Sequence, residues 1–290
     1  MSQPTFDLQS HSTLSDGALP PADVVAAAAA AGVELLALSD HDSALGIAEA
    51  AAAARAAGID LVPATEITAI LDGKQDLHVC GYLIDPDEPT LAHTLERSRN
   101  DRERRAEKMS ASLRELGFAI DDDQLQRRTA EGKTIGRPHL AQAVVSHPDN
   151  QERLAHDGLL EPTEFLVAYL IEGKPAFAPR DAPTVEQAIE LIHGAGGVAV
   201  WAHPFWDIKD PGEVVGTVDR FRRAGLDGVE AFYVSHTEAE TRLLVSHCDE
   251  HGLLTTGSSD FHGPQHHTFS RFRAFCLYGL EPNLGPIAGS

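Results

Sequence analysis

Five stretches of the sequence place histidine and carboxylate side chains directly after runs of residues typical of β-strands. The stretches are Asp7-Leu8-Gln9-Ser10-His11, Ser39-Asp40-His41-Asp42, Glu66 with His78, His203-Pro204, and Ser259-Asp260-Phe261-His262. Imidazole nitrogens and carboxylate oxygens are the ligands that first-row divalent metals take from proteins. Any one of these residues alone is more often an ordinary loop residue. Together they indicate a metal-dependent hydrolytic centre with several ions.

Strand and helix patterns alternate at both ends of the sequence and would bring these residues together. The expected strands are 5–9, 34–39, 59–63, 197–202, 228–233 and 253–257, and the expected helices are 22–31, 45–57, 185–194, 212–224 and 238–251. Strands that alternate with helices through short loops predict a parallel sheet or barrel. In such barrels the carboxyl ends of the strands carry the chemistry. We therefore expect the metal ligands at one mouth of an α/β barrel.

A helical segment interrupts this alternation. A long charged helix is expected at 91–116, and the shorter helical patterns that follow it include no convincing strand. We therefore expect a barrel domain formed by residues 1–85 and 176–290, with a helical insertion subdomain at 86–175.

Two further features concern the edges of the barrel. The strand-like runs 67–71 and 77–84 are close enough to form a hairpin. A last strand is expected at 272–277, and the residues after it have the pattern of a loosely structured tail.

The composition narrows the classes of partner. The formal net charge of -21 opposes long-range attraction to nucleic acid phosphates and anionic membranes, so we expect no long duplex and no membrane partner. A small phosphorylated ligand remains compatible, because bound cations dominate the local field. The three cysteines are far apart, and neither a secretory signal nor a membrane-spanning run is evident, which favours a cytoplasmic protein. No obligate protein partner is evident.

The ordered set of motifs resembles the PHP family, named for polymerase and histidinol phosphatase. The motifs are Asp7-Leu8-Gln9-Ser10-His11-Ser12 with Ser15-Asp16-Gly17, Ser39-Asp40-His41-Asp42, Glu66, His78-Val79-Cys80-Gly81-Tyr82, Ala202-His203-Pro204, and Ser259-Asp260-Phe261-His262-Gly263. Each motif is weak alone, but the set spans almost the whole chain in the family's order. The resemblance implies a distorted (β/α)7 barrel with a trinuclear site.

The resemblance also implies how the ligands are shared among the ions, which would be Mn, Fe or Zn. The first ion would take Gln9, His11, Glu66 and Asp260; the second would take Glu66, His78 and His203, with Glu66 bridging; the third would take Asp16, His41 and His262. The family usually has histidine at position 9, whereas the Gln9 amide is neutral and a weaker ligand. We therefore expect two firmly held ions and a first position that is weakly held.

The implied activity is hydrolysis of a phosphate monoester or diester by a metal-bound hydroxide. Asp40 is expected to assist by accepting an imidazole N–H or by fixing a metal-bound water. Either His203 or a metal-bound water would protonate the leaving group. The segment Gly136-Arg137-Pro138-His139 resembles that of stand-alone PHP phosphoesterases acting on nucleoside 3',5'-bisphosphates and on short or 5'-phosphorylated RNA. Arg137 and His139 are therefore expected to bind the substrate.

Two other functions remain open at this point. An amidohydrolase-like C–N hydrolase uses similar ligands but typically begins with His-x-His, which Gln9 breaks. A catalytically weakened module that binds a phosphorylated ligand is supported by Gln9 alone. The other histidines of the barrel, His247 and His251 among them, are interpreted as solvated or structural, and Trp201 and Trp206 as packing the barrel rim rather than stacking on a base.

Overall fold

The computed structural model describes residues 4–72, 75–130 and 135–289. The chain divides into two compact units. We call Met1–Glu96 with Ala182–Ser290 the barrel unit, and Arg97–Asp181 the helical unit. Within the described residues, none of the helices combines the length and the apolar character needed to cross a lipid bilayer.

The barrel unit is built on a seven-stranded mixed sheet whose strands follow chain order. The strands are β1 (Phe6–Asp7), β2 (Leu35–Leu38), β3 (Asp60–Leu71), β4 (Gln75–Tyr82), β5 (Val198–Trp201), β6 (Gly228–Tyr233) and β7 (Leu254–Ser258). Strand β4 is antiparallel to both of its neighbours, and all other pairs are parallel. The predicted hairpin is therefore confirmed as β3 and β4.

The two ends of the sheet meet, which nearly closes it into a barrel. The Leu8 amide donates to the Gly257 carbonyl at 3.2 Å, and the His11 amide donates to the Phe261 carbonyl at 2.8 Å. These bonds join the residues after β1 to those after β7. The predicted distorted (β/α)7 barrel is thus confirmed, and the antiparallel β4 is the main distortion.

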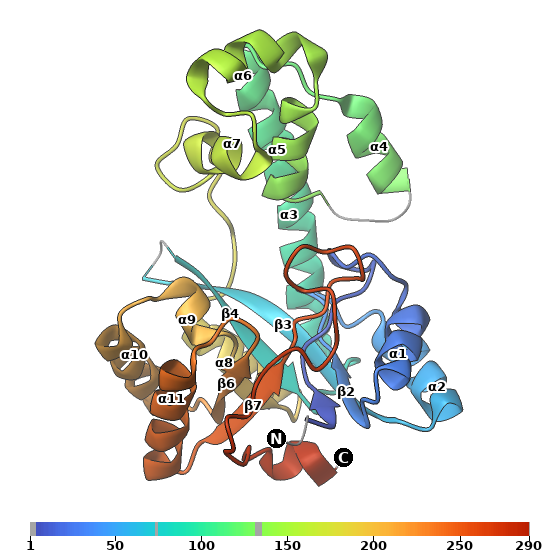
Figure 1. Ribbon diagram of the computed structural model, residues 1–290, viewed down its shortest axis with the longest axis vertical. Coiled ribbons are helices and arrows are strands. Elements are labelled where there is room, and N and C mark those ends of the chain that lie inside the picture. The colour runs from blue at the N-terminus through green and yellow to red at the C-terminus, as the bar shows by residue number, and fades with distance from the viewer. Residues whose placement is uncertain (1–3, 73–74, 131–134, 290) are drawn as a thin grey trace. The chain divides into compact units, whose positions relative to one another are not determined.

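Helices surround the strands of the barrel unit (Figure 1). They are α1 (Pro21–Ala30), α2 (Ile47–Ala57), the first residues of α3 (Pro89–Glu115), α8 (Val185–Gly194), α9 (Pro204–Asp207), α10 (Pro211–Arg223), α11 (Glu238–His251) and the 3-10 helix η2 (Gly285–Gly289). Side-chain caps fix where three of them begin: Thr184 accepts from the Gln187 amide before α8, Asp210 accepts from the Glu213 amide before α10, and Thr237 accepts from the Glu240 amide before α11.

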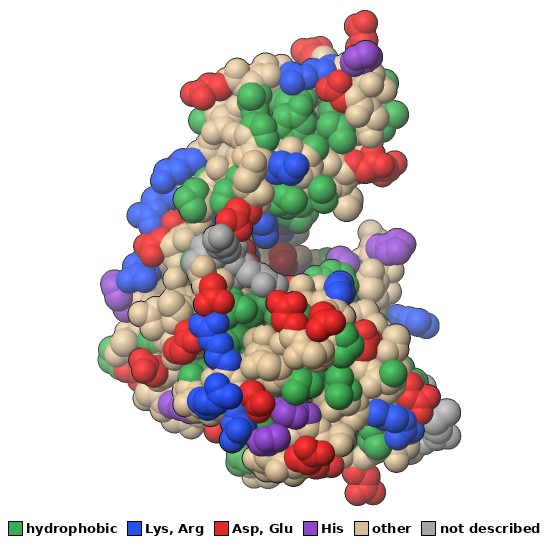
Figure 2. All heavy atoms as spheres, turned by 90° about the vertical axis from the view of Figure 1, so that its left-hand side faces the viewer, with side chains coloured by type: hydrophobic (Ala, Val, Ile, Leu, Met, Phe, Trp, Pro, Cys, Tyr) green, Lys and Arg blue, Asp and Glu red, His purple; other side chains and the backbone are tan. Residues whose placement is uncertain are grey.

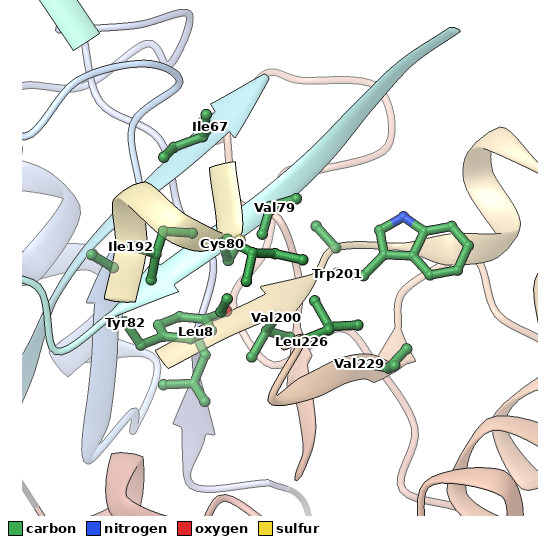
Figure 3. Close-up of a cluster of buried hydrophobic side chains, with 14 of the residues drawn as sticks. Leu8, Ile67, Val79, Cys80, Tyr82, Ile192, Val200, Trp201, Leu226 and Val229 are labelled. Carbon is green, nitrogen blue, oxygen red and sulfur yellow. The ribbon is translucent and has the colours of Figure 1, made fainter. Parts of the chain in front are cut away.

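Apolar side chains from the central strands and α8 form the main core. Figure 3 shows Val79, Tyr82 and Ile192 within this cluster. Helix α8 packs directly on the β4 backbone, since a Cβ atom at Gly81 would lie 2.8 Å from Ile192 Cγ1. This close approach explains why glycine is required at the fourth position of the His78–Tyr82 motif. It also holds β4, which carries His78, in a fixed place.

The helical unit has its own core. It contains the remainder of α3, α4 (Asp122–Ala130), α5 (Arg137–Val145), the 3-10 helix η1 (Pro148–Asn150), α6 (Gln151–Asp157) and α7 (Pro162–Tyr169). Leu113, Phe118, Leu140 and Phe165 are buried together at its centre. Phe118 and Phe165 pack edge to face, with ring centroids 5.0 Å apart.

Two expectations about strands were wrong. The runs 59–63 and 67–71 form one continuous strand, β3, so Glu66 lies within a strand rather than after one. The predicted strand at 272–277 is a series of turns and bends instead. Arg273 there has a left-handed φ of 60°, which breaks any strand, and its amide donates to Asp7.

The tail after this segment is also anchored rather than loose. The Thr255 amide in β7 donates to the Asn283 carbonyl at 2.9 Å, and Ile287 is fully buried. The tail therefore forms part of the barrel core.

Candidate metal centre

The nine predicted metal ligands all belong to the barrel unit and gather in one place. Those that follow strands are Gln9 and His11 after β1, His41 after β2, His203 after β5, and Asp260 and His262 after β7. Asp16 lies in the turn after His11, whereas Glu66 and His78 lie within β3 and β4. Residue His41 pairs with Glu66 in an isolated parallel bridge, which brings β2 and β3 ligands together.

Glu66 is the hub of the cluster. Its Oε2 lies 3.1 Å from His11 Nε2 and 3.4 Å from His41 Nδ1. Its Oε1 lies 2.7 Å from His78 Nδ1 and 3.2 Å from His203 Nε2. The carboxylate is fully buried. Each oxygen therefore faces a different pair of imidazoles, as a carboxylate that bridges two cations would.

Asp16 forms a second point of convergence. Its carboxylate lies 3.6 Å from His41 Nε2 and 3.4 Å from His262 Nε2. The rings of His41 and His262 stack on the ring of His11, with centroids 4.4 and 4.3 Å away. The ligand set predicted for the third ion is thus assembled around one carboxylate.

The loop that carries His11 and Asp16 is held by Asp40. The Asp40 carboxylate accepts from the Ser12 amide and hydroxyl, both at 2.7 Å, and from the Ser15 hydroxyl at 2.6 Å. A Cβ atom at Gly17 would lie 2.1 Å from the His11 carbonyl oxygen, so only glycine fits this tight turn. These bonds go to the serines of the loop rather than to an imidazole. The catalytic assignment of Asp40 stays a prediction, and its contacts are those of a residue that positions the loop.

Asp260 faces the cluster from the end of β7. Its Oδ1 lies 3.0 Å from His11 Nε2, and the Tyr233 hydroxyl donates to its Oδ2 at 2.8 Å. Tyr233 and Glu230 both lie on β6. Glu230 is buried, and its carboxylate accepts from the His203 amide at 2.9 Å. Sequence reasoning missed Glu230 and Tyr233. The available signal was an acidic residue in the middle of an otherwise apolar strand.

Gln9 is oriented differently from the other predicted ligands. Its Nε2 donates to Glu66 Oε2 at 2.8 Å, and its Oε1 accepts from the Ser258 hydroxyl at 3.4 Å. The amide therefore presents a donor to the hub carboxylate and turns its oxygen toward β7. A ligand role for Gln9 requires the amide to turn over, and it stays a prediction.

Several imidazole nitrogens in the cluster are buried without a well-aligned hydrogen-bond partner, as expected for atoms that bind cations. Among the described residues, His11 Nε2, His41 Nδ1 and His78 Nδ1 have no well-aligned hydrogen-bond partner, although each faces a carboxylate oxygen. Polar atoms buried without partners are costly. Mixed nitrogen and oxygen donors suit Mn, Fe or Zn. The residues present therefore fit divalent ions held between Glu66, Asp16 and Asp260.

The electrostatics of the cluster lead to a prediction about protons. Burial alone would lower the pKa of His11 and His203, but nearby carboxylates reverse the effect. Asp260 and Glu66 raise the pKa of His11 well above its ordinary value, and Glu66 raises that of His203 to about 10. Both rings are therefore protonated in the metal-free protein at pH 7, whereas a metal binds only the neutral ring. The carboxylates of Asp260 and Asp16 also raise the pKa of His262. Loading the metal-free protein with Mn²⁺ at pH 7 should therefore release at least two protons per chain, from His11 and His203, and more where His262 is also protonated.

This proton release can be measured by calorimetry in buffers of different ionisation enthalpy. Metal affinity should also fall as the pH is lowered, because protons then compete better for the rings. Loading without proton release, or with proton uptake, would contradict the ligand assignment of these two histidines.

The two predicted substrate-binding residues lie in the helical unit. Arg137 is the first residue of α5, and the His139 ring accepts from the Gly136 amide at 3.0 Å. His139 thus helps to cap the start of α5, which sequence reasoning did not predict. Contact of Arg137 and His139 with substrate stays a prediction.

Comparison with known proteins places this geometry in a family. The PHP domain matches residues 7–132. The chain is 37% identical to a 3',5'-nucleoside bisphosphate phosphatase of Chromobacterium violaceum, over 89% of this chain and 87% of that protein. It is 33% identical to a 5'-3' exoribonuclease of Haemophilus influenzae, over 89% of this chain and 90% of that protein.

Solved structures agree with this placement. A structure described as an amidohydrolase from Chromobacterium violaceum superimposes with a TM-score of 0.78 at 35% identity, covering 93% of this chain and 91% of that chain. A putative metal-dependent phosphoesterase from Bifidobacterium adolescentis gives 0.77 at 26% identity, covering 99% and 96%. The fold, the ordered motifs and these relatives together show that the chain belongs to the PHP family of metal-dependent phosphoesterases.

Proposed function

We propose that this phosphoesterase removes a phosphate from a small nucleotide or a short RNA, and that a nucleoside 3',5'-bisphosphate is its first candidate substrate. The observation that carries the proposal is the buried cluster around Glu66, whose two oxygens face four imidazoles. The named activities of the relatives, on nucleoside bisphosphates and on RNA, support this substrate class.

Divalent ions at this cluster would supply the positive charge that neutralises phosphoryl oxygens and the acidity that activates water. The protein's own residues then fix the geometry. Asp40 holds the loop of His11 and Asp16, while Tyr233 orients Asp260. His203 Nε2 faces Glu66, so its remaining proton would sit on Nδ1, which lies 3.8 Å from an Asp207 oxygen. This N–H would face Asp207 and hold the orientation of the ring, and protonation of the leaving group by His203 stays a prediction.

An exposed aromatic side chain beside the cluster suggests how a base is held. Trp201 is fully buried, whereas Trp206 packs beside Tyr233 with ring centroids 6.5 Å apart and remains 47% exposed. The Trp206 ring lies 5.7 Å from the ring of Phe269, which in turn lies 5.4 Å from that of His262. The Lys209 ammonium lies 5.9 Å from the Trp206 ring centroid, and the exposed part of the indole is our candidate for stacking on a nucleobase.

Replacing Trp206 with alanine should therefore raise KM for a nucleoside 3',5'-bisphosphate roughly 5- to 150-fold, since base stacking contributes about 1–3 kcal/mol. Turnover of p-nitrophenyl phosphate should change little, because that substrate has no base. Trp206→Phe should recover most of the lost affinity. Equal losses on both substrates would show that Trp206 acts through the structure of the site instead.

A C–N hydrolase is the second candidate, because one similar solved structure is described as an amidohydrolase. Many such enzymes bridge their metals with a carbamate formed on lysine. In the described part of the barrel unit the single lysine is Lys209, whose ammonium donates to the Phe205 and Trp206 carbonyls. That amine is committed to the backbone, which favours the phosphoesterase.

The test is phosphate release from a panel assayed with added Mn²⁺. The panel holds pAp, short 5'-phosphorylated RNA, histidinol phosphate and p-nitrophenyl phosphate, with His41→Ala as the inactive control. Product identification for pAp should show loss of a single phosphate and identify which one. Turnover of pAp or RNA that disappears in the control supports the proposal. No release by protein shown to hold its metals would shift the choice to the C–N hydrolase or to a binding module.

A further inference from the structure

Three polar side chains form a compact cluster on the outer surface of the barrel unit. Asp219 comes from α10, and His247 and His251 come from α11. Asp219 Oδ1 lies 3.3 Å from His247 Nε2 and 3.9 Å from His251 Nε2. The two histidines are one helical turn apart, and their ring centroids are 4.4 Å apart. We call this set the α10–α11 cluster.

The hydrogen bonds of His251 prepare its ring for a metal. Its Nδ1 lies 2.9 Å from the His247 backbone carbonyl, which can only accept, so Nδ1 carries the proton. In the neutral ring Nε2 then holds the free lone pair, and this nitrogen points toward Asp219. A histidine that donates its other N–H to a carbonyl is the usual arrangement around protein-bound metals.

The spacing of the three ligand atoms is close to what a zinc ion needs. Two ligands about 2.0–2.1 Å from a tetrahedral zinc ion lie about 3.3–3.4 Å apart. The Asp219–His247 distance of 3.3 Å has this value, and it is also a hydrogen bond in which His247 Nε2 donates to the carboxylate, so an ion would displace that proton. The Asp219–His251 distance of 3.9 Å is longer and would have to shorten when an ion binds. All three ligand atoms lie within 4.8 Å of one another.

The position of the cluster separates it from the catalytic centre. His251 is the last residue of α11, just before β7 begins, and Asp219 lies in the last turns of α10, before β6. The helices of an α/β barrel end beside the amino ends of the strands that follow, whereas Asp260 and His203 follow the carboxyl ends. This amino-terminal end of a barrel serves stability rather than chemistry. Figure 2 shows histidines among acidic and basic side chains on this side of the surface.

We propose that the α10–α11 cluster is a second metal site, which binds one Zn²⁺ or a similar imidazole-preferring ion and ties the two helices together. Water would complete the coordination, because His247 is 12% and His251 27% exposed. Mn²⁺ and Mg²⁺ bind weakly to such a site, since Mn²⁺ stands at the low end of the affinity order and Mg²⁺ prefers oxygen ligands. The site is therefore expected to be selective against Mn²⁺. The guanidinium of Arg222, whose Nε lies 3.7 Å from Asp219, competes with the ion for that carboxylate.

The test compares zinc binding by the Mn²⁺-loaded wild-type enzyme and by His251→Ala. Equilibrium dialysis with zinc, followed by elemental analysis, should show one zinc ion per chain fewer in the variant. Zinc that enters the catalytic centre adds the same amount to the zinc content of both proteins, so it does not affect the difference between them. Zinc should also raise the Tm of the wild type by more than that of the variant, because binding to the folded state stabilises it.

His193→Ala is the matched control. His193 is also a partly exposed helical histidine, and its Nε2 lies 2.8 Å from Asp227, but no third ligand joins this pair among the described residues. This control should bind as much zinc as the wild type. Equal zinc content and equal Tm shifts in wild type, His251→Ala and His193→Ala would overturn the proposal.

Arg222→Gln provides a test that does not remove a ligand. The substitution takes away the competing positive charge, so the Kd for zinc should fall roughly two- to fivefold. An ion-pair cluster without metal affinity would show no such gain. Phosphatase activity should be unchanged in all three variants, so failure of this site and failure of the proposed function are separate results.

Discussion

Replacing Glu66 with glutamine is expected to lower phosphate release by roughly 10³-fold or more and to reduce the metal content of the protein. The two Glu66 oxygens face four imidazoles, so the neutral amide would weaken two cation positions at once. Stabilisation of transition-state charge by metals contributes several kcal/mol, and each 1.36 kcal/mol is about tenfold in rate. Phosphate release and elemental analysis measure the two effects.

Asp60→Asn is the matched control for this substitution. Asp60 is an exposed carboxylate at the start of the same strand, β3, and has no contact with the cluster residues in the described structure. It should retain wild-type activity and metal content. If Glu66→Gln kept both its metals and its activity, Glu66 would not be the bridging ligand.

Replacing Gln9 with histidine is expected to increase metal content by up to one ion per chain and to tighten retention of metal during dialysis. Gln9 now donates an N–H to Glu66 and turns its oxygen toward Ser258, so the donor side of the amide faces the hub carboxylate. An imidazole at this position can offer its neutral nitrogen beside His11, Glu66 and Asp260. Elemental analysis after dialysis against a weak chelator measures the change.

Gln9→Ala separates this gain from a simple loss of the Gln9–Glu66 hydrogen bond. Alanine removes the donor without adding a ligand, so its metal content should stay at or below that of the wild type. If Gln9→His and Gln9→Ala gave the same metal content, position 9 would not belong to a metal site.

The sequence was sufficient to predict the barrel and the residues that gather in it. Strand and helix periodicity is local, so β6, α8 and α11 were predicted with their observed bounds. Most ligand positions followed from the ends of the other predicted strands, because parallel strands bring their carboxyl ends to one edge. His203 and Asp260, far apart in the chain, could be placed together on this ground.

What the sequence could not predict depends on contacts between distant segments. Arg273 takes a left-handed conformation and bonds to Asp7, which no local pattern near residue 273 indicates. The hydrogen bond from Gln9 to Glu66 depends on which way an amide turns in a crowded site. Glu230 has the strand pattern of a core residue, and its role beside His203 appears only when β5 and β6 pair.

Two histidines on the outside of the barrel also have a contact that the sequence could not predict. His247 and His251 were interpreted as solvated or structural because they lie on a helix without a motif partner. Their partner, Asp219, lies on the preceding helix, and only the packing of α10 against α11 brings it within reach.

Hydrolysis at the Glu66 cluster is tested most directly by titrating metal-stripped protein with Mn²⁺ while phosphate release from pAp is followed. We expect no release without metal, a rise that reaches its plateau after two to three ions per chain, and no rise for His41→Ala. Phosphate release by metal-free protein, or full activity in His41→Ala, would contradict hydrolysis at the Glu66 cluster.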